Sequence, residues 1–118
     1  MARIVLSTEV IQLVHILFAE LSQLYRETVL PVLVVRWSSG TKENRRGPNG
    51  ESIWETIEPP GWLAHVSPWG ESDHASITDN TIVIDDIRLL LDQRAKGVDG
   101  ILHITSTDRT LHVEHKET

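Results

Sequence analysis

Residues 8–28, TEVIQLVHILFAELSQLYRET, decide the fold class, because their apolar positions recur at the spacing of an α-helix. The apolar stripe consists of Val10, Leu13, Val14, Leu17, Leu21 and Leu24, and Ile11, Phe18 and Tyr25 widen it. Ser7 or Thr8 can cap the first turn, and Pro31 ends the pattern. We therefore expect a long amphipathic helix that packs this stripe on one face of a sheet.

The segments that follow this helix have patterns typical of strands. Residues 32–38 form a continuous β-branched run, and residues 51–58 are expected to alternate in direction, with Ile53 and Glu55 on one side and Trp54 and Thr56 on the other. Asn49-Gly50 is a strong turn signal. Residues 51–58 are therefore expected to return against residues 32–38, which leaves residues 39–50 as a long polar turn.

A second, shorter helix is expected over residues 86–96, directly after a central strand at residues 81–85. Asp85 or Asp86 can cap its start, and Gly97 stands where the end of a helix favours glycine. A C-terminal hairpin of two strands is expected after this helix, over residues 101–106 and 110–115.

The order of these elements predicts an α+β fold, because the strands come in runs with few helices between them. We expect a mostly antiparallel sheet of five to six strands packed against the long N-terminal helix. The shorter helix then precedes the C-terminal hairpin. The length and the absence of any linker predict a single domain over residues 1–118.

The composition excludes several kinds of chemistry. The 118 residues include no cysteine, which rules out disulfides, thiolate zinc sites and a cysteine nucleophile. The net charge is −6, and residues 71–118 hold ten acids against five Lys and Arg. This acidity disfavours duplex nucleic acid as a partner and favours a basic protein. Neither a membrane-spanning apolar run nor a signal peptide is recognisable, so we expect a cytoplasmic protein with no membrane partner.

All four tryptophans lie in one window rich in proline and glycine, at positions 37, 54, 62 and 69. Trp37 and Trp54 are expected on paired strands, largely as core residues or as cross-strand partners. Trp62 and Trp69 follow turn-forming residues, and at least one of them is expected to be partly exposed. An exposed tryptophan beside a stiff turn is typical of an interface anchor.

The C-terminal hairpin holds the best candidate for site chemistry. If Asp108-Arg109 is a two-residue turn, Thr105 faces His112 and His103 faces Glu114. Two histidines and a carboxylate on one face suit a divalent metal or an acid–base pair. A solvated polar face is the favoured interpretation, and we expect neither a metal nor a cofactor.

A second pattern resembles the motif of the two-histidine phosphoesterases. It consists of two His-x-Ser/Thr units on expected strands, His65-Val66-Ser67 and His103-Ile104-Thr105. The resemblance implies that the two histidines act as acid and base while the hydroxyl groups hold the phosphate. As an enzyme, the chain would use His65, His103, His112 and Glu114.

The function that these features favour is a non-catalytic, cytoplasmic protein-binding module. An inhibitor or immunity-type protein that blocks a basic toxin or nuclease fits the acidity of the chain. Its contacts are expected in the 59–74 loop and around the second helix, at Trp62, Trp69, Asp85, Asp86 and Asp92. The alternatives are a small histidine-dependent enzyme, a secretion-chaperone-like protein, a homodimer, and a domain whose Trp62 and Trp69 line a small-ligand pocket.

Overall fold

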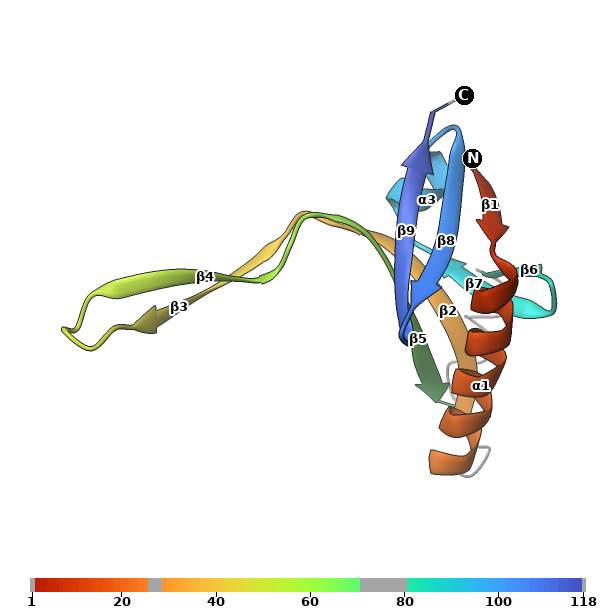
Figure 1. The fold of residues 1–118 in the computed structure, drawn as a ribbon, viewed down its shortest axis with the longest axis horizontal. Coiled ribbons are helices and arrows are strands. Elements are labelled where there is room, and N and C mark those ends of the chain that lie inside the picture. Colours follow the sequence, from red (N-terminus) through yellow and green to blue (C-terminus); the bar gives the residue numbers. More distant parts are fainter. Residues whose placement is uncertain (1, 26–28, 71–80, 118) are drawn as a thin grey trace.

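The computed structural model describes residues 2–25, 29–70 and 81–117, which form an α+β fold of two helices and nine strands (Figure 1). The elements in chain order are β1 (Arg3–Leu6), α1 (Thr8–Leu24), β2 (Val29–Ser38), β3 (Thr41–Arg46), β4 (Ser52–Glu58), β5 (Gly61–Gly70), β6 (Thr81–Ile84), β7 (Ile87–Leu91), α3 (Gln93–Gly97), β8 (Ile101–Thr107) and β9 (Thr110–Lys116). Residues 71–74 of the predicted 59–74 contact loop lie outside the described residues.

The described strands form three sheets rather than the single sheet of five to six strands that the sequence predicts. Their strand orders are β1-β8-β9, β5-β2-β7-β6 and β3-β4. Most pairs are antiparallel, as expected, but β1 runs parallel to β8 and β2 runs parallel to β7. The sheet set is therefore mixed, because β1 and β2 each pair with a strand that is distant in the sequence.

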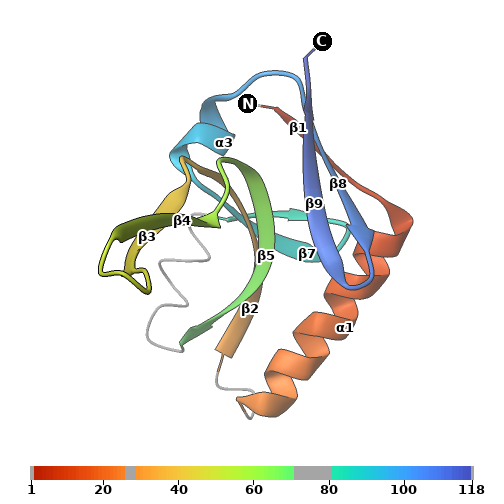
Figure 2. The same ribbon diagram turned by 60° about the vertical axis from the view of Figure 1, so that its left-hand side comes forward.

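The hydrophobic core lies where the three-stranded sheet, the four-stranded sheet and α1 meet (Figure 2). Val10 and Val14 are the fully buried residues of α1, and the core continues into Leu33 of β2, Leu89 of β7 and Ile104 of β8. The Ser7 hydroxyl oxygen accepts a hydrogen bond from the Val10 amide at 3.2 Å, which confirms the predicted cap. None of the helices in these described ranges has the length and apolar character needed to cross a membrane.

A second helix does precede the C-terminal hairpin, but the predicted range of residues 86–96 is wrong, because Ile87–Leu91 form strand β7 and only Gln93–Gly97 are helical. Asp85 and Asp86 have φ values of 52° and 63° and form the turn between β6 and β7. Asp can adopt this left-handed conformation more readily than most residues, so the pair serves a hairpin instead of a helix cap. The helix begins only after Asp92, whose carboxylate accepts a hydrogen bond from the Ala95 amide at 2.8 Å.

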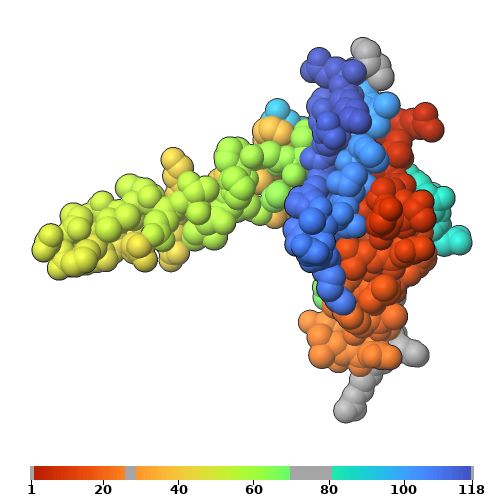
Figure 3. Space-filling model, viewed as in Figure 1, coloured from red at the N-terminus to blue at the C-terminus, as the bar shows by residue number. Residues whose placement is uncertain are grey.

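Strands β3 and β4 form a long hairpin that projects from the rest of the described chain, which we call the body. The sequence predicts a polar turn over most of this segment. Strand β4 pairs with β3 instead of with residues 32–38, and β2 pairs with β5 over its whole length. We call residues 41–58 the arm; Figures 1 and 3 show it extending away from the sheets. The radius of gyration is 16.6 Å, whereas a compact domain of this length has about 13–14 Å.

Candidate functional site

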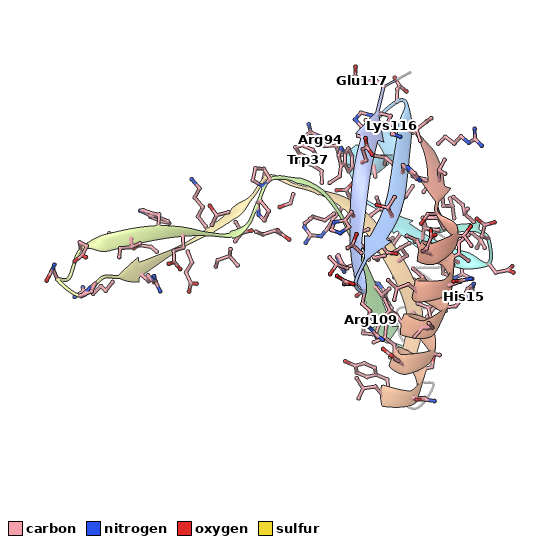
Figure 4. All side chains as sticks on the ribbon, in the orientation of Figure 1. His15, Trp37, Arg94, Arg109, Lys116 and Glu117 are labelled. Atoms are coloured by element: carbon pink, nitrogen blue, oxygen red, sulfur yellow. The ribbon has the colours of Figure 1, made fainter. Side chains whose placement is uncertain are left out.

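The arm carries the large apolar side chains that lie furthest from the body. Trp54 is 65% exposed and Ile57 is 59% exposed. Trp54 lies opposite Asn44 in the β3–β4 register, so the diagonal neighbours on its face are Lys42 and Arg46. Figure 4 shows side chains projecting from both faces of the arm into open surroundings. The arm thus offers an exposed aromatic ring between two cations.

The two faces of the arm differ in charge. The face that we call the Trp54 face has two cations and no carboxylate: Lys42, Asn44, Arg46, Ser52, Trp54 and Thr56. On the opposite face, Arg45 forms an ion pair with Glu55, and Glu43 lies directly across from Glu55. The Trp54 face is therefore the basic surface of the arm.

A hydrogen-bonded cluster lies where the arm joins the body, a junction of β2, β4 and β5 that we call the root of the arm. The Arg36 guanidinium contacts one oxygen of Glu58 through Nη2 at 2.6 Å, and Ser38 Oγ donates to the other oxygen at 2.8 Å. Ser38 is only 4% exposed, and its hydroxyl also accepts from the Gly40 amide at 3.1 Å. Arg36 Nε donates to His65 Nε2 at 3.3 Å. These bonds join β2, β4 and β5 at the point where the arm leaves the body.

The same cluster shifts two pKa values. The hydrogen bond from Arg36, followed by that from Ser38, lowers the pKa of Glu58. Burial lowers the pKa of His65, and the nearby positive charge of Arg36 lowers it further. Both groups bind protons less readily in the folded protein than in the unfolded chain. Their contribution to stability is therefore present at neutral pH and is lost on acidification, first for His65 and then for Glu58.

Substitution of Arg36 by Gln tests this electrostatic coupling. The pKa of His65 is expected to rise, because the variant removes a positive charge and leaves the Glu58 carboxylate free to favour the imidazolium ion. The measurement is an NMR titration of the His65 ring protons. An unchanged or lower His65 pKa in the variant would show that Arg36 does not influence this ring.

A group of aromatic rings supports the other side of the root. The Trp37 and Trp62 rings meet edge to face, with centroids 5.3 Å apart. The Arg94 guanidinium lies 4.2 Å from the centroid of the Trp37 ring, and Figure 4 labels both of these residues. The Asp92 carboxylate accepts from the Trp37 amide at 2.8 Å. Trp37 is half-buried. The prediction for Trp54 is wrong, because β4 leaves the body: Trp54 is exposed and lies opposite Asn44, whereas Trp37 pairs with Trp62.

The five predicted partner-binding residues do not form one patch. Trp62 and Trp69 are both half-buried and stand seven positions apart on β5, which corresponds to about 23 Å along a strand. Asp92 is engaged with α3 and Trp37, whereas Asp85 and Asp86 are exposed at the β6–β7 turn. An interface that used all five residues would have to contact separate regions of the body.

An apolar groove on the surface of the body is not lined by the tryptophans. It has a volume of about 310 Å³ and lies between the end of α1 and β5, lined by Leu17, Glu20, Leu21, Leu24 and Val66. The ligand-binding alternative, which relied on Trp62 and Trp69, therefore gains no support from this groove.

The predicted register of the C-terminal hairpin is confirmed. His103 pairs with Glu114 and Thr105 pairs with His112. The turn forms because Asp108 and Arg109 adopt φ values of 49° and 67°. Across the described ranges, however, no three His, Asp or Glu residues are grouped so that they could hold a metal ion.

The two His-x-Ser/Thr units lie on different sheets. His65 lies on β5 of the four-stranded sheet and His103 lies on β8 of the three-stranded sheet. The next residue after each histidine, Val66 or Ile104, packs in the shared core. Because successive side chains of a strand point to opposite faces, both histidines point away from this core. The two units therefore lie on different sheets, with their histidines on surfaces that face away from the core.

The sequence reasoning missed the arm and its root, although one signal for both was present. Counting outwards from the turn signal at Asn49-Gly50 places residue 41 opposite 58 and residue 37 opposite 62, which is the observed pairing. The same count therefore places Glu58 at the end of the arm that adjoins β2.

Comparison with known proteins adds no family to this description. The chain matches no protein-family model, and neither a curated protein nor a solved structure matches it. Its function therefore has to be inferred from the arm, the root and the body themselves.

Proposed function

We propose that the chain is a non-catalytic protein-binding module and that the arm is its main contact element. The observation that carries this proposal is the 65% exposure of Trp54 on a ribbon that leaves the body. Tryptophan is enriched at the energetic centres of protein interfaces, because it buries a large apolar area together with one N–H donor. An isolated two-stranded ribbon is only marginally stable in water, so contact with a partner would also stabilise the arm.

The root makes the arm suited to binding. The bonds of Glu58 with Arg36 and Ser38, together with the Trp37–Trp62 contact, restrain the direction in which the arm projects. A restrained contact element loses less conformational entropy on binding than a free loop does. This restraint supports a binding role for the arm over a role as a passive linker.

The charges favour different partners for the arm and the body. The net charge of −6 supports a basic partner for the body, as an inhibitor or immunity-type protein would have. The two cations beside Trp54 instead favour a neutral or acidic surface opposite the arm. Within the class of binding modules, we therefore assign the arm to a partner surface without excess positive charge.

Trp54→Ala tests this function directly. We expect partners captured from native lysate by the intact chain to be lost, with at least tenfold weaker binding, equivalent to about 1.4 kcal/mol. The melting temperature is expected to change little, because the side chain lies outside the core. Leu24→Ala is the matched control, since Leu24 is 73% exposed but lies on α1. Equal capture by both variants would contradict the proposal.

A further inference from the structure

The two edges of the arm are protected unequally. Strand β3 carries Lys42, Arg45 and Arg46, the kind of charged side chains with which proteins block pairing at a sheet edge. Strand β4 carries no Lys, Arg or Pro, and its side chains include the exposed Trp54 and Ile57. Its composition is that of a strand suited to pairing on both sides. The β4 edge is therefore open to strand addition, whereas the β3 edge is not.

We propose that β4 pairs antiparallel with β4 of a second copy of this chain, so that the two arms form one four-stranded ribbon. This inference rests on the proposed function and names the partner of the arm. Three or more strands are generally needed for a stable sheet, and the pairing supplies two more strands to each arm. It uses the same surface on both copies, as two-fold dimers do.

The positions of the charges and of Trp54 together favour one register. A two-fold axis through Trp54 places its ring opposite the Trp54 ring of the second copy, and it places Ser52 opposite Thr56 and Ile53 opposite Glu55. An axis through Glu55 would instead bring two carboxylates directly together, which destabilises a pair of strands. The Trp54 axis opposes no like charges along β4 and gains a cross-strand aromatic pair.

The same register keeps the cations of the two Trp54 faces apart. One row of side chains runs across the four strands of the paired arms. It contains Lys42 and Thr56 of one copy, and then Ser52 and Arg46 of the second copy. Three strand spacings separate these two cations, or about 14 Å. The screening length at physiological ionic strength is about 8 Å, so their repulsion is weak. Self-pairing is therefore compatible with the basic character of this face.

Disulfide cross-linking tests the pairing, and the absence of native cysteine gives a clean background. Mixing Ser52→Cys with Thr56→Cys under mild oxidation is expected to give a covalent heterodimer, because directly opposite residues have the Cα separation that a disulfide needs. Each variant alone is expected to stay uncrosslinked, since its two cysteines would lie four residues out of register, about 13 Å apart. Lys42→Cys mixed with Arg46→Cys is the matched control on β3 and should give no cross-link.

A charge-reversal pair tests the axis itself. Trp54→Lys and Trp54→Glu each oppose like charges at the axis, so sedimentation equilibrium should report at least tenfold weaker self-association for each variant than for the intact chain. An equimolar mixture opposes unlike charges and is expected to restore association. Leu24→Lys, remote from the arm, should associate like the intact chain.

Three results would overturn the self-pairing. They are a monomeric intact chain at every concentration, a cross-link through β3 instead of β4, and no recovery in the Trp54→Lys and Trp54→Glu mixture. If the intact chain stays monomeric while Trp54→Ala still loses a captured partner, the arm binds a different protein and the proposed function stands. If Trp54→Ala loses neither association nor a captured partner, both proposals fail.

Discussion

Replacing Leu33 with alanine is expected to lower the free energy of unfolding by about 2–5 kcal/mol, because the change opens a cavity in a packed interior. Leu33 is fully buried at the centre of β2, where it pairs with Val66 of β5 on one side and Leu89 of β7 on the other. It belongs to the core that joins the two main sheets and α1. The measurement is urea-induced unfolding followed by circular dichroism.

Leu24→Ala is the control for this prediction. Leu24 belongs to the apolar stripe that the sequence predicts for α1, but it is 73% exposed in the last turn of the helix. Its replacement is expected to cost less than about 0.5 kcal/mol. Similar losses for the two variants would mean that the end of α1 is packed as tightly as the centre of the sheet.

The exposure of Leu24 shows what the periodicity of a sequence can predict and what it cannot. The helical spacing of residues 8–28 and the Ser7 cap correctly identify α1, since both signals are local. Periodicity does not say how far the helix extends beyond the sheets. Of its predicted stripe, only Val10 and Val14 are buried in the core.

Local signals were ambiguous over residues 86–96. Ile87, Leu89 and Leu91 alternate towards the core, but Ile87, Leu90 and Leu91 also fit the spacing of a short helix. The outcome depends on the parallel pairing of β7 with β2, a contact between distant segments. In the C-terminal hairpin the partner strand is adjacent, and there the register was predicted correctly.

The candidate site depended on a similar choice of strand partner. The pattern of residues 51–58 is that of a strand, but it does not reveal whether the partner is residues 32–38 or residues 41–46. The first choice buries Trp54 and the second exposes it. The basic residues of β3 led to the prediction of a polar turn, although charged side chains are also typical of strands at the edge of a sheet.

Replacing Gly100 with alanine is expected to destabilise the fold by at least about 2 kcal/mol, through backbone strain and overpacking together. Gly100 has a φ of +95°, and an added Cβ would collide with the Lys116 carbonyl oxygen. The Gly100 carbonyl also accepts a hydrogen bond from the Arg3 amide at 2.8 Å, so the residue lies where β1, β8 and β9 meet. The backbone there cannot move without disturbing all three strands.

Two other glycines separate the causes of this loss. Gly50 has a φ of +79° with open space around it, so Gly50→Ala measures backbone strain without a collision, about 1 kcal/mol. Gly97 has neither a positive φ nor a close neighbour, and Gly97→Ala is expected to be neutral or stabilising by up to about 1 kcal/mol. Thermal and urea unfolding of the three variants should rank Gly100→Ala as the most damaging. Equal losses for Gly100→Ala and Gly50→Ala would mean that β9 shifts to make room, and that the junction of β1, β8 and β9 is less rigid than its hydrogen bonds indicate.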